Sequence, residues 1–576
     1  MTPFKQIFAQ LLTPHLPELS VEEIINFIEV PPQGLWADLA FPCFSLAKTR
    51  GQSPVQISGD IANTIQKTPN TNQNITSKWP YINISFDPLF VIEKIKEFNT
   101  HNSTLSTPKG LVLIESPSPN TNKPLHLGHV RNMVLGNVLA RSMTHEWYDI
   151  QKVEVVNDRG IHICKSMLAY KLWGNNAEPD KKSDHYVGDW YVRYASEEEK
   201  NPELKEQAQS MLRDREDGDP EVRALWKKMN KRAIDGMRET YTRYWTHIDD
   251  ATFESDVYQD GKEVAEQGLA KGVFVRDPKG NIALPLPINE EETSYFVVLR
   301  SDGTTLYATQ DLALVDKRFK TYHMDKMVYV VGNEQDDYFR ALFKCFKALD
   351  YPFASQCHHL SYGMIELPNG KMKSRTWNVI DADNLIEELH QESVEEITRR
   401  NSDLDERTVH ERAEKIALWA INFFMIKTDP AKWFVFDPAE SLSFEGETGP
   451  YIQYTYARIW SIITKVKELG TNNQDEKKLE TNNQDEKELE TTKQLYFHLW
   501  SQDEIISKSN TEYKPSTLAR YTLDLCQMIN SFYQQYHIIN PGDLSLTQTR
   551  GQVLQDVHTT LGNMMDILWI PRIDIM

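Results

Sequence analysis

The sequence predicts a multidomain fold: a small α+β domain, then an α/β domain built on a parallel sheet and carrying a helical insertion, then an all-α bundle. Three observations predict it. The 576 residues exceed what one hydrophobic core of ~100–200 residues supports. Short apolar runs alternate with helical patterns after residue 110, and beyond about Phe436 the pattern is helical to the end.

The first predicted domain covers residues 1–108. It begins with helical periodicity, passes through Pro31-Pro32, and contains the alternating run Tyr81 to Phe86, which is typical of a half-buried strand. A polar segment from Asn99 to Gly110, rich in Thr, Ser and Asn, is typical of a linker. We therefore expect a small α+β domain that ends before a second, larger unit.

The second predicted domain covers residues 109–435. Its strand candidates are short apolar runs with the length and bounds of buried parallel strands: Leu111 to Ile114, Val153 to Val156, Phe296 to Leu299 and Met327 to Val331. Between them, residues 174–250 are highly charged, with aromatic and apolar residues at helical spacing. The pattern indicates a nucleotide-binding parallel sheet interrupted by a helical insertion.

The third predicted domain, residues 436–576, is a helical bundle. It contains a tandem ten-residue repeat, TNNQDEKKLE at Thr471 to Glu480 and TNNQDEKELE at Thr481 to Glu490. The repeat is too polar to bury much surface. We expect a surface expansion, helical or disordered, without a catalytic role.

Charge and composition restrict the class of protein. The formal charge of −20 argues against general affinity for nucleic acid, so positive charge for any RNA partner must be local, and DNA is not an expected partner. No run of about 18 apolar residues exists and the N-terminus lacks signal-peptide features, which predicts a cytoplasmic protein away from membranes. Five separated cysteines without a CxxC pair argue against structural zinc and a disulfide framework.

The most informative motif is PNTNKPLHLGHVRN, from Pro119 to Asn132, directly after the first strand candidate. His126 and His129 flank Leu127-Gly128 where a helix should begin, and a helix N-terminus attracts phosphate. Gly128 allows a nucleotide to approach the backbone. The imidazoles can donate hydrogen bonds to phosphate oxygens that gain charge as pyrophosphate leaves. A metal pair or two core histidines are the alternatives.

Three segments together resemble the class I aminoacyl-tRNA synthetases, specifically the arginyl-tRNA synthetases: PNTNKPLHLGH, YATQD at 307–311 and GKMKSR at 370–375. The resemblance extends over almost the whole chain. Pro31-Pro32 and Tyr81 to Phe86 resemble the family's N-terminal tRNA-binding domain, and Thr448 to Tyr454 resembles the start of its helical anticodon-binding domain. It implies a Rossmann-like catalytic domain and ATP-dependent ligation of L-arginine to tRNA through arginyl-adenylate.

The resemblance assigns the catalytic and ATP-binding residues. It implies catalysis by His126, His129, Lys371 and Lys123, and ATP binding by His126, Gly128, His129, Lys371, Lys373 and Ser374. Lysines on a loop can close over the triphosphate and neutralise charge as pyrophosphate leaves. Mg²⁺ is expected to accompany ATP, without a dedicated protein metal site.

The lysine loop departs from the family pattern. Ser374 stands where the usual class I form has a second lysine, and Thr376-Trp377 stands where arginyl enzymes often continue with Lys-Gly. Lys123 is the expected compensating cation. The contributions of Lys373 and Arg375 to neutralising the phosphate charge are not assigned.

The residues expected to select arginine can be argued from the charge of its guanidinium group. A guanidinium is planar, permanently cationic and carries five donors, so its pocket needs carboxylates. Tyr307 and Asp311 are four residues apart and share one face of a helix, although such a pair is more often an ordinary surface pair. The resemblance implies that arginine contacts Ser118, Asn120, His129, Glu254, Tyr307, Asp311 and Gln335. Asp158 is either part of this pocket or a turn residue.

For RNA, the resemblance implies that Gln453, Tyr454 and Arg458, with Trp460 nearby, contact the anticodon loop, where unstacked bases meet such side chains. The alternative is an aromatic stripe in the core. The expected partners are arginine-accepting tRNA, L-arginine and ATP, and the chain is expected to be a monomer. The chain also resembles enzymes that bind tRNA before they activate the amino acid, but the sequence does not decide whether tRNA is required here.

Three other functions compete with this one. Another class I synthetase, such as a lysyl enzyme, would share the ATP motifs but need not combine Tyr307, Asp311 and Gln335. A small nucleotidyltransferase would share only the histidine motif. A catalytically silent RNA-binding paralogue is suggested by Thr376-Trp377, and the intact histidines and Lys371 argue against it.

Overall fold

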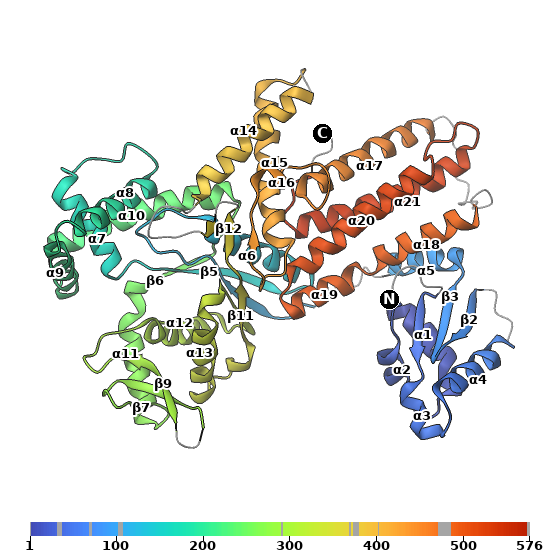
Figure 1. Cartoon of the computed structure of the whole chain (residues 1–576), viewed down its shortest axis with the longest axis horizontal. Coiled ribbons are helices and arrows are strands. Elements are labelled where there is room, and N and C mark those ends of the chain that lie inside the picture. The colour runs from blue at the N-terminus through green and yellow to red at the C-terminus, as the bar shows by residue number, and fades with distance from the viewer. Residues whose placement is uncertain are drawn as a thin grey trace.

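The computed structural model describes residues 2–31, 37–67, 72–101, 107–289, 292–367, 370–371, 380–400, 403–470 and 485–572. Figure 1 shows a central sheet with a helical lobe on one side and the C-terminal helices on the other. The N-terminal unit lies beside the C-terminal helices, so two domains far apart in the sequence are in contact. None of the helices in the described ranges has the length and apolarity needed to cross a membrane.

The N-terminal unit packs helices against a three-stranded antiparallel sheet of order β1-β3-β2. In β3, buried and half-buried residues alternate, as the period-two pattern predicts. Its elements are α1 (Thr2–Leu12), α2 (Val21–Phe27), β1 (Leu39–Pro42), α3 (Phe44–Arg50), α4 (Pro54–Gln66), β2 (Gln73–Lys78), β3 (Tyr81–Phe86) and α5 (Pro88–His101).

The central sheet is parallel, with strand order β11-β10-β4-β5-β6. Strand β4 comes first in the chain yet lies in the middle, so the strand order reverses beside it. Ligands of such sheets bind at the carboxyl ends of the strands at this reversal. The strands are β4 (Leu111–Glu115), β5 (Asp149–Val156), β6 (Asp250–Phe253), β10 (Lys326–Gly332) and β11 (Cys357–Tyr362), and the helices that pack on them are α6 (Leu127–His145), α11 (Glu254–Ala270), α12 (Tyr307–Tyr322) and α13 (Asp336–Ala348).

The predicted strand at Phe296 to Leu299 exists, but its expected place in the parallel sheet is wrong. It belongs to β9 (Thr293–Leu299), in a separate antiparallel sheet with β7 (Val275–Arg276) and β8 (Ile282–Pro287). The connection from β8 to β9 is too short for the crossover that a parallel neighbour requires.

The charged stretch after Gly174 forms helices α8 (Ser183–Glu198), α9 (Glu203–Asp217) and α10 (Pro220–Arg243). They share a separate hydrophobic core with α7 (Ile161–Trp173), built around buried aromatic residues such as Tyr170 and Tyr194. We call α7–α10 the helical lobe.

The last part of the chain is helical, as predicted, and helices already begin before residue 436. Three short strands, β12 (Ile365–Leu367), β13 (Gly370–Lys371) and β14 (Phe434–Val435), precede or separate them. The helices are α14 (Ala382–Arg400), α15 (Glu406–Ile426), α16 (Pro438–Ser441), α17 (Gly449–Gly470), α18 (Glu486–Trp500), α19 (Gln502–Glu512), α20 (Pro515–Gln535) and α21 (Leu544–Ile567). Most of the repeat, 471–484, lies outside the described residues, and its last residues begin α18.

Candidate active site

A cavity of about 620 Å³ opens at the carboxyl ends of β4, β5 and β10, where the strand order reverses. All the residues expected to bind arginine line it: Ser118, Asn120, His129, Glu254, Tyr307, Asp311 and Gln335. His126 and Gly128 line it as well. The fold thus brings together residues from four segments that are far apart in the sequence.

The histidine pair opens helix α6, which begins at Leu127, where the motif predicts a helix start. His126 is the N-cap, and its Nδ1 accepts a hydrogen bond from the backbone N–H of Gly128 at 3.2 Å. His129 Nδ1 accepts one from the N–H of His126 at 3.1 Å. Because each Nδ1 is an acceptor, the proton of each neutral ring lies on Nε2, which can donate to a ligand.

Both imidazoles are neutral at physiological pH. Burial, followed by the charge of Lys123, lowers the pKa of His126 to about 3. Burial, His126 and Lys123 together hold the pKa of His129 well below its usual value. The pair therefore adds donors without adding permanent positive charge. The cation beside it is Lys123, which is half-buried, and burial lowers its pKa.

The lysine loop can be placed only at its start. Lys371 ends β13, and its backbone pairs with Glu366 of β12. The side chain of Lys371 and all of Lys373, Ser374 and Arg375 lie outside the described residues.

The opposite wall of the cavity is acidic. Burial and the charge of Glu115 raise the pKa of Asp311 to about 7, although the hydroxyl of Tyr338 donates a hydrogen bond to its Oδ2. Burial also raises the pKa of Glu254, whose Oε1 accepts a hydrogen bond from Gln310 Nε2 at 2.6 Å. A cation entering here would favour the ionised form of both carboxyls.

Family models and relatives agree on one assignment. The model for "tRNA synthetases class I (R), catalytic domain" matches residues 94–437, "Arginyl tRNA synthetase N terminal domain" matches 4–86, and "DALR anticodon binding domain" matches 452–576. The arginine–tRNA ligase of Treponema denticola is 38% identical over 100% of this chain and 99% of its own. This chain belongs to the arginyl-tRNA synthetases. The predicted family, fold class and type of enzyme are thereby confirmed.

Other relatives extend the comparison. The arginine–tRNA ligase of Borreliella burgdorferi is 37% identical over 96% of this chain and 95% of its own. The arginyl-tRNA synthetase of Thermus thermophilus has the same fold, with a TM-score of 0.80 at 23% identity over 99% of this chain and 100% of that one. The arginyl-tRNA synthetase of Plasmodium falciparum has a TM-score of 0.77 at 18% identity, over 100% of this chain and 98% of that one. ATP, arginine and tRNA are the substrates that this family assignment implies.

The sequence reasoning missed several pocket residues of the synthetase. Glu115, the last residue of β4, lines the cavity and pairs with Arg318 of α12, and both are buried. A charged residue ending an apolar strand was the available signal, because such positions face the ligand in parallel sheets. Asn132 lines the same cavity, and its Oδ1 is buried without a hydrogen-bond partner among the described residues.

Two of the four residues considered for RNA binding do not offer a free surface. Gln453 is fully buried, and its Nε2 donates to the carbonyl of Pro571 at 3.2 Å, so it belongs to the bundle core. Trp460 is half-buried and stacks on His558 at 5.2 Å. Tyr454 and Arg458 are exposed and lie one turn apart on α17.

Asp158 has a structural role. Its Oδ1 accepts from the backbone N–H of Ser255 at 3.0 Å and its Oδ2 from the Ser255 hydroxyl at 2.7 Å. The carboxylate thus holds the first turn of α11, while its neighbour Asn157 lines the cavity.

Proposed function

We propose that the cavity between the histidine pair and the acidic wall is where this synthetase activates arginine with ATP. One observation carries the proposal: phosphate-directed donors and guanidinium-directed acceptors line one cavity of about 620 Å³. His126 and His129 present Nε2 donors from α6, whereas Asp311 and Glu254 present carboxyl groups from α12 and α11.

In the first step, an arginine carboxylate oxygen attacks the α-phosphorus of ATP. The bond to the bridging oxygen breaks, and pyrophosphate leaves with the electron pair. His126 and His129 donate to oxygens that gain charge, the N-terminus of α6 adds its dipole, and Gly128 leaves room for the nucleotide. Lys371 and Lys123 are the proposed cations, with Lys373 and Ser374 contributing to ATP binding.

Magnesium is proposed to arrive with the triphosphate. In the described parts of the chain, one group of three side chains has metal-ligand spacing, Asp184, His185 and Asp383, and the Lys182 ammonium already lies 2.7 Å from Asp383. We propose that ATP carries its own Mg²⁺ into the cavity, where the ion would screen the phosphate charge.

Arginine is proposed to bind with its guanidinium toward Asp311 and its reacting end toward the histidines. Asp311 and Glu254 accept from the planar donor fork, with Tyr307 and Gln335 as further polar contacts. Ser118, Asn120 and His129 hold the amino-acid end near ATP. Lysine lacks the planar fork, which explains selection of arginine.

In the second step, a ribose hydroxyl of the terminal tRNA adenosine attacks the activated carbonyl and AMP leaves. We propose residues 1–108 as the N-terminal tRNA-binding domain, 109–435 as the catalytic domain with an insertion at 174–250, and 436–576 as the anticodon-binding domain. Tyr454 and Arg458 are the proposed RNA contacts. We further propose a cytoplasmic monomer that does not bind DNA and binds tRNA before activating arginine.

The test is ATP-dependent charging of tRNA with each amino acid in turn, together with arginine-dependent exchange of pyrophosphate into ATP. Charging with arginine alone is expected, with pyrophosphate exchange that requires tRNA. Replacement of His126 by Asn should reduce exchange at least about 100-fold, since about 2.7 kcal/mol or more of transition-state stabilisation is lost. Full exchange by that variant would refute the proposed site.

A further inference from the structure

The start of helix α14 is held against the histidine motif by main-chain hydrogen bonds. Leu127 N–H donates to the carbonyl of Ile380 at 3.0 Å, and Ala382 N–H donates to the carbonyl of Leu125 at 3.0 Å. His126 and Asp381 thus face each other in an antiparallel bridge. In the sequence, Ile380 comes nine residues after Lys371. The start of α14 therefore follows the lysine motif closely in the sequence and is hydrogen-bonded to the histidine motif.

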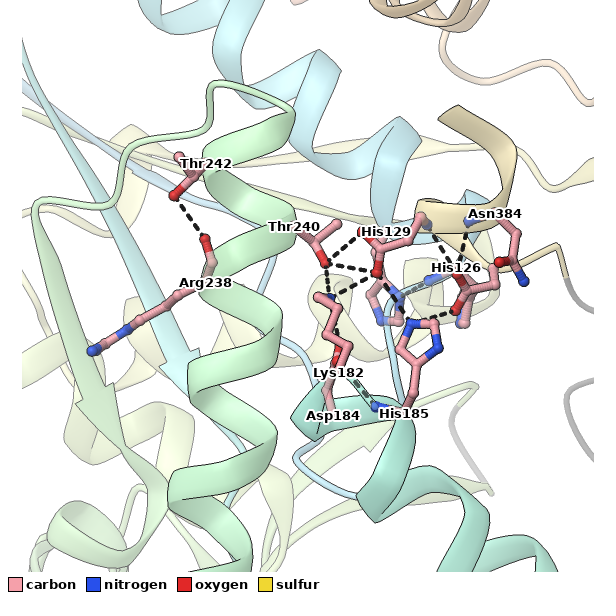
Figure 2. A network of polar contacts seen from close by, with 11 residues as sticks. His126, His129, Lys182, Asp184, His185, Arg238, Thr240, Thr242 and Asn384 are labelled. Atoms are coloured by element: carbon pink, nitrogen blue, oxygen red, sulfur yellow. Dashed lines mark hydrogen bonds and ion pairs between the residues drawn. The ribbon is translucent and has the colours of Figure 1, made fainter. Parts of the chain in front are cut away.

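Side chains of the helical lobe also contact the start of α14 (Figure 2). Lys182, which precedes α8, donates from Nζ to Asp383 Oδ2 at 2.7 Å and to the Thr240 hydroxyl of α10 at 2.6 Å. His185 Nε2 lies 3.1 Å from Asp383 Oδ2 and 3.4 Å from Asp381 Oδ2. We call Lys182, His185, Thr240 and Asp383 the lobe clamp.

The lobe side of the clamp has little freedom to move. Asp184 is fully buried, and its Oδ2 lies 3.1 Å from Lys182 Nζ. A Cβ atom on Gly236 of α10 would come within 2.4 Å of Asp184 Oδ1, so the two helices approach as closely as glycine permits. Close packing of this kind transmits displacement instead of absorbing it.

Electrostatics favour the clamped arrangement. Although burial alone would raise it, hydrogen bonds from His185 and Lys182 hold the pKa of Asp383 at about 2. The hydrogen bond to Asp383 raises the pKa of His185, with further contributions from Asp381 and Asp184. Since Lys182 already supplies a cation between Asp184 and Asp383, the cluster acts as an ion-pair network and not as a metal site.

We propose that the lobe clamp positions the histidine motif for adenylate formation, so that Lys182, His185 and Asp383 are positioning residues of the reaction. The clamp contacts Asp383 at the start of α14. Residues 380–382 in turn make main-chain hydrogen bonds to Leu125 and Leu127, and His126 lies between those two residues. The helical lobe is thereby coupled to the pyrophosphate-leaving step. The inference rests on the proposed role of His126.

The clamp should influence kcat more than arginine binding. The acidic residues Asp311 and Glu254 lie on α12 and α11, which make none of the clamp's hydrogen bonds. Because a displacement of His126 weakens contacts made in the transition state, it lowers kcat and leaves the arginine KM nearly constant.

The experiment measures pyrophosphate exchange by the full-length chain with tRNA present. Asp383→Asn and Lys182→Met are each expected to lower kcat about 10- to 100-fold, with the arginine KM changed less than about twofold. Lys182→Arg, which keeps the cation, should recover most of the rate. Lys181→Met is the matched control, since Lys181 also precedes α8 and its exposed pair is with Asp189 of that helix.

These measurements distinguish the positioning role of the lobe clamp from the proposed role of His126 in the active site. Unchanged kcat in both clamp variants, or an arginine KM that rises as much as kcat falls, would overturn the clamp while His126→Asn still tests the site itself. If the melting temperature shows that Asp383→Asn is unfolded, His185→Gln replaces it, because that side chain contributes through Asp381 and Asp383. The expected kcat loss then applies to His185→Gln.

Discussion

Two buried ion pairs in this molecule differ in how fully their polar atoms are hydrogen-bonded. At the contact between the N-terminal unit and α18, Lys493 Nζ lies 3.1 Å from Asp38 Oδ2 and 2.9 Å from Glu490, and donates to the carbonyl of Phe86 at 3.3 Å. In the cavity, Glu115 pairs with Arg318, but Nε and Nη2 of Arg318 are buried without partners among the described residues.

The difference separates a stabilising pair from a pair in a binding site. Asp38 also accepts the backbone N–H of Phe86 at 2.7 Å, so both charged groups have direct partners where the N-terminal unit contacts α18, although burial raises the pKa of Asp38. In the cavity, the unpaired Oδ1 of Asn132 and the Asp311 carboxyl, whose pKa burial raises to about 7, leave favourable polar interactions for a ligand to complete. The predictions below test this contrast, beginning with the largest effect.

Lys493→Met should lower the free energy of unfolding by about 3–5 kcal/mol, because it leaves the Asp38 carboxylate buried without its cation. Urea denaturation followed by tryptophan fluorescence measures this loss. Arginine KM in the folded variant should be unchanged. Lys94→Met is the control, since it removes an exposed pair with Glu97 and should cost less than about 0.5 kcal/mol. A loss below about 1 kcal/mol for Lys493→Met would contradict the assigned stabilising role.

Asp311→Asn should reduce kcat/KM for arginine about 100- to 1,000-fold, equivalent to about 3–4 kcal/mol, because a buried charge-assisted pair with the guanidinium is lost. The ATP KM should change less than about threefold. Steady-state pyrophosphate exchange measures both constants. Asp316→Asn, on the same helix and paired with Lys320, is the matched control. Equal losses for arginine and ATP would contradict the role assigned to Asp311.

Arginine binding should weaken as the pH falls below 7. Burial and Glu115 raise the pKa of Asp311 to about 7, so the carboxyl is protonated below that pH and ionised above it. Only the ionised form pairs with the guanidinium, which predicts that arginine KM rises up to about tenfold per pH unit below the pKa. A pH profile between 5.5 and 8.5 measures it, and a flat profile would show that Asp311 stays ionised throughout.

Tyr338→Phe should move the break in that profile to higher pH. The Tyr338 hydroxyl stabilises the ionised Asp311, so its removal raises the pKa of the carboxyl further. At neutral pH the arginine KM should rise about five- to tenfold, equivalent to about 1 kcal/mol. Loss of activity without movement of the pH break would indicate a packing role for the ring instead.

The sequence predicted the parts of the site that depend on local spacing. The two histidines bracket a helix start, and Tyr307 and Asp311 share a helical face, so both pairs could be recognised before any fold was known. Glu115 and Arg318 could not be paired in this way, because 203 residues separate them and only the parallel sheet brings them together. Tyr338 was missed for the same reason.

Other errors have equally specific causes. The apolar pattern at Phe296 to Leu299 identified a strand but not its partner, since hairpin and crossover neighbours share the same periodicity. Gln453 was assigned to RNA although the α17 face that carries it turns inward, which residue type alone does not reveal. Periodicity predicts elements, whereas the assignment of faces requires knowledge of what packs against them.

The smallest effect is expected when both charges of the interface pair are removed. Lys493→Met alone leaves a buried carboxylate, but adding Asp38→Asn removes that charge while the amide oxygen can still accept the N–H of Phe86. The double variant should therefore recover most of the lost stability and fall within about 1 kcal/mol of the parent. A double-mutant cycle in urea measures the coupling. If the two losses simply added, the cost of Lys493→Met would come from packing of its aliphatic stem, and the contrast with the cavity would have to be explained by shape instead of charge.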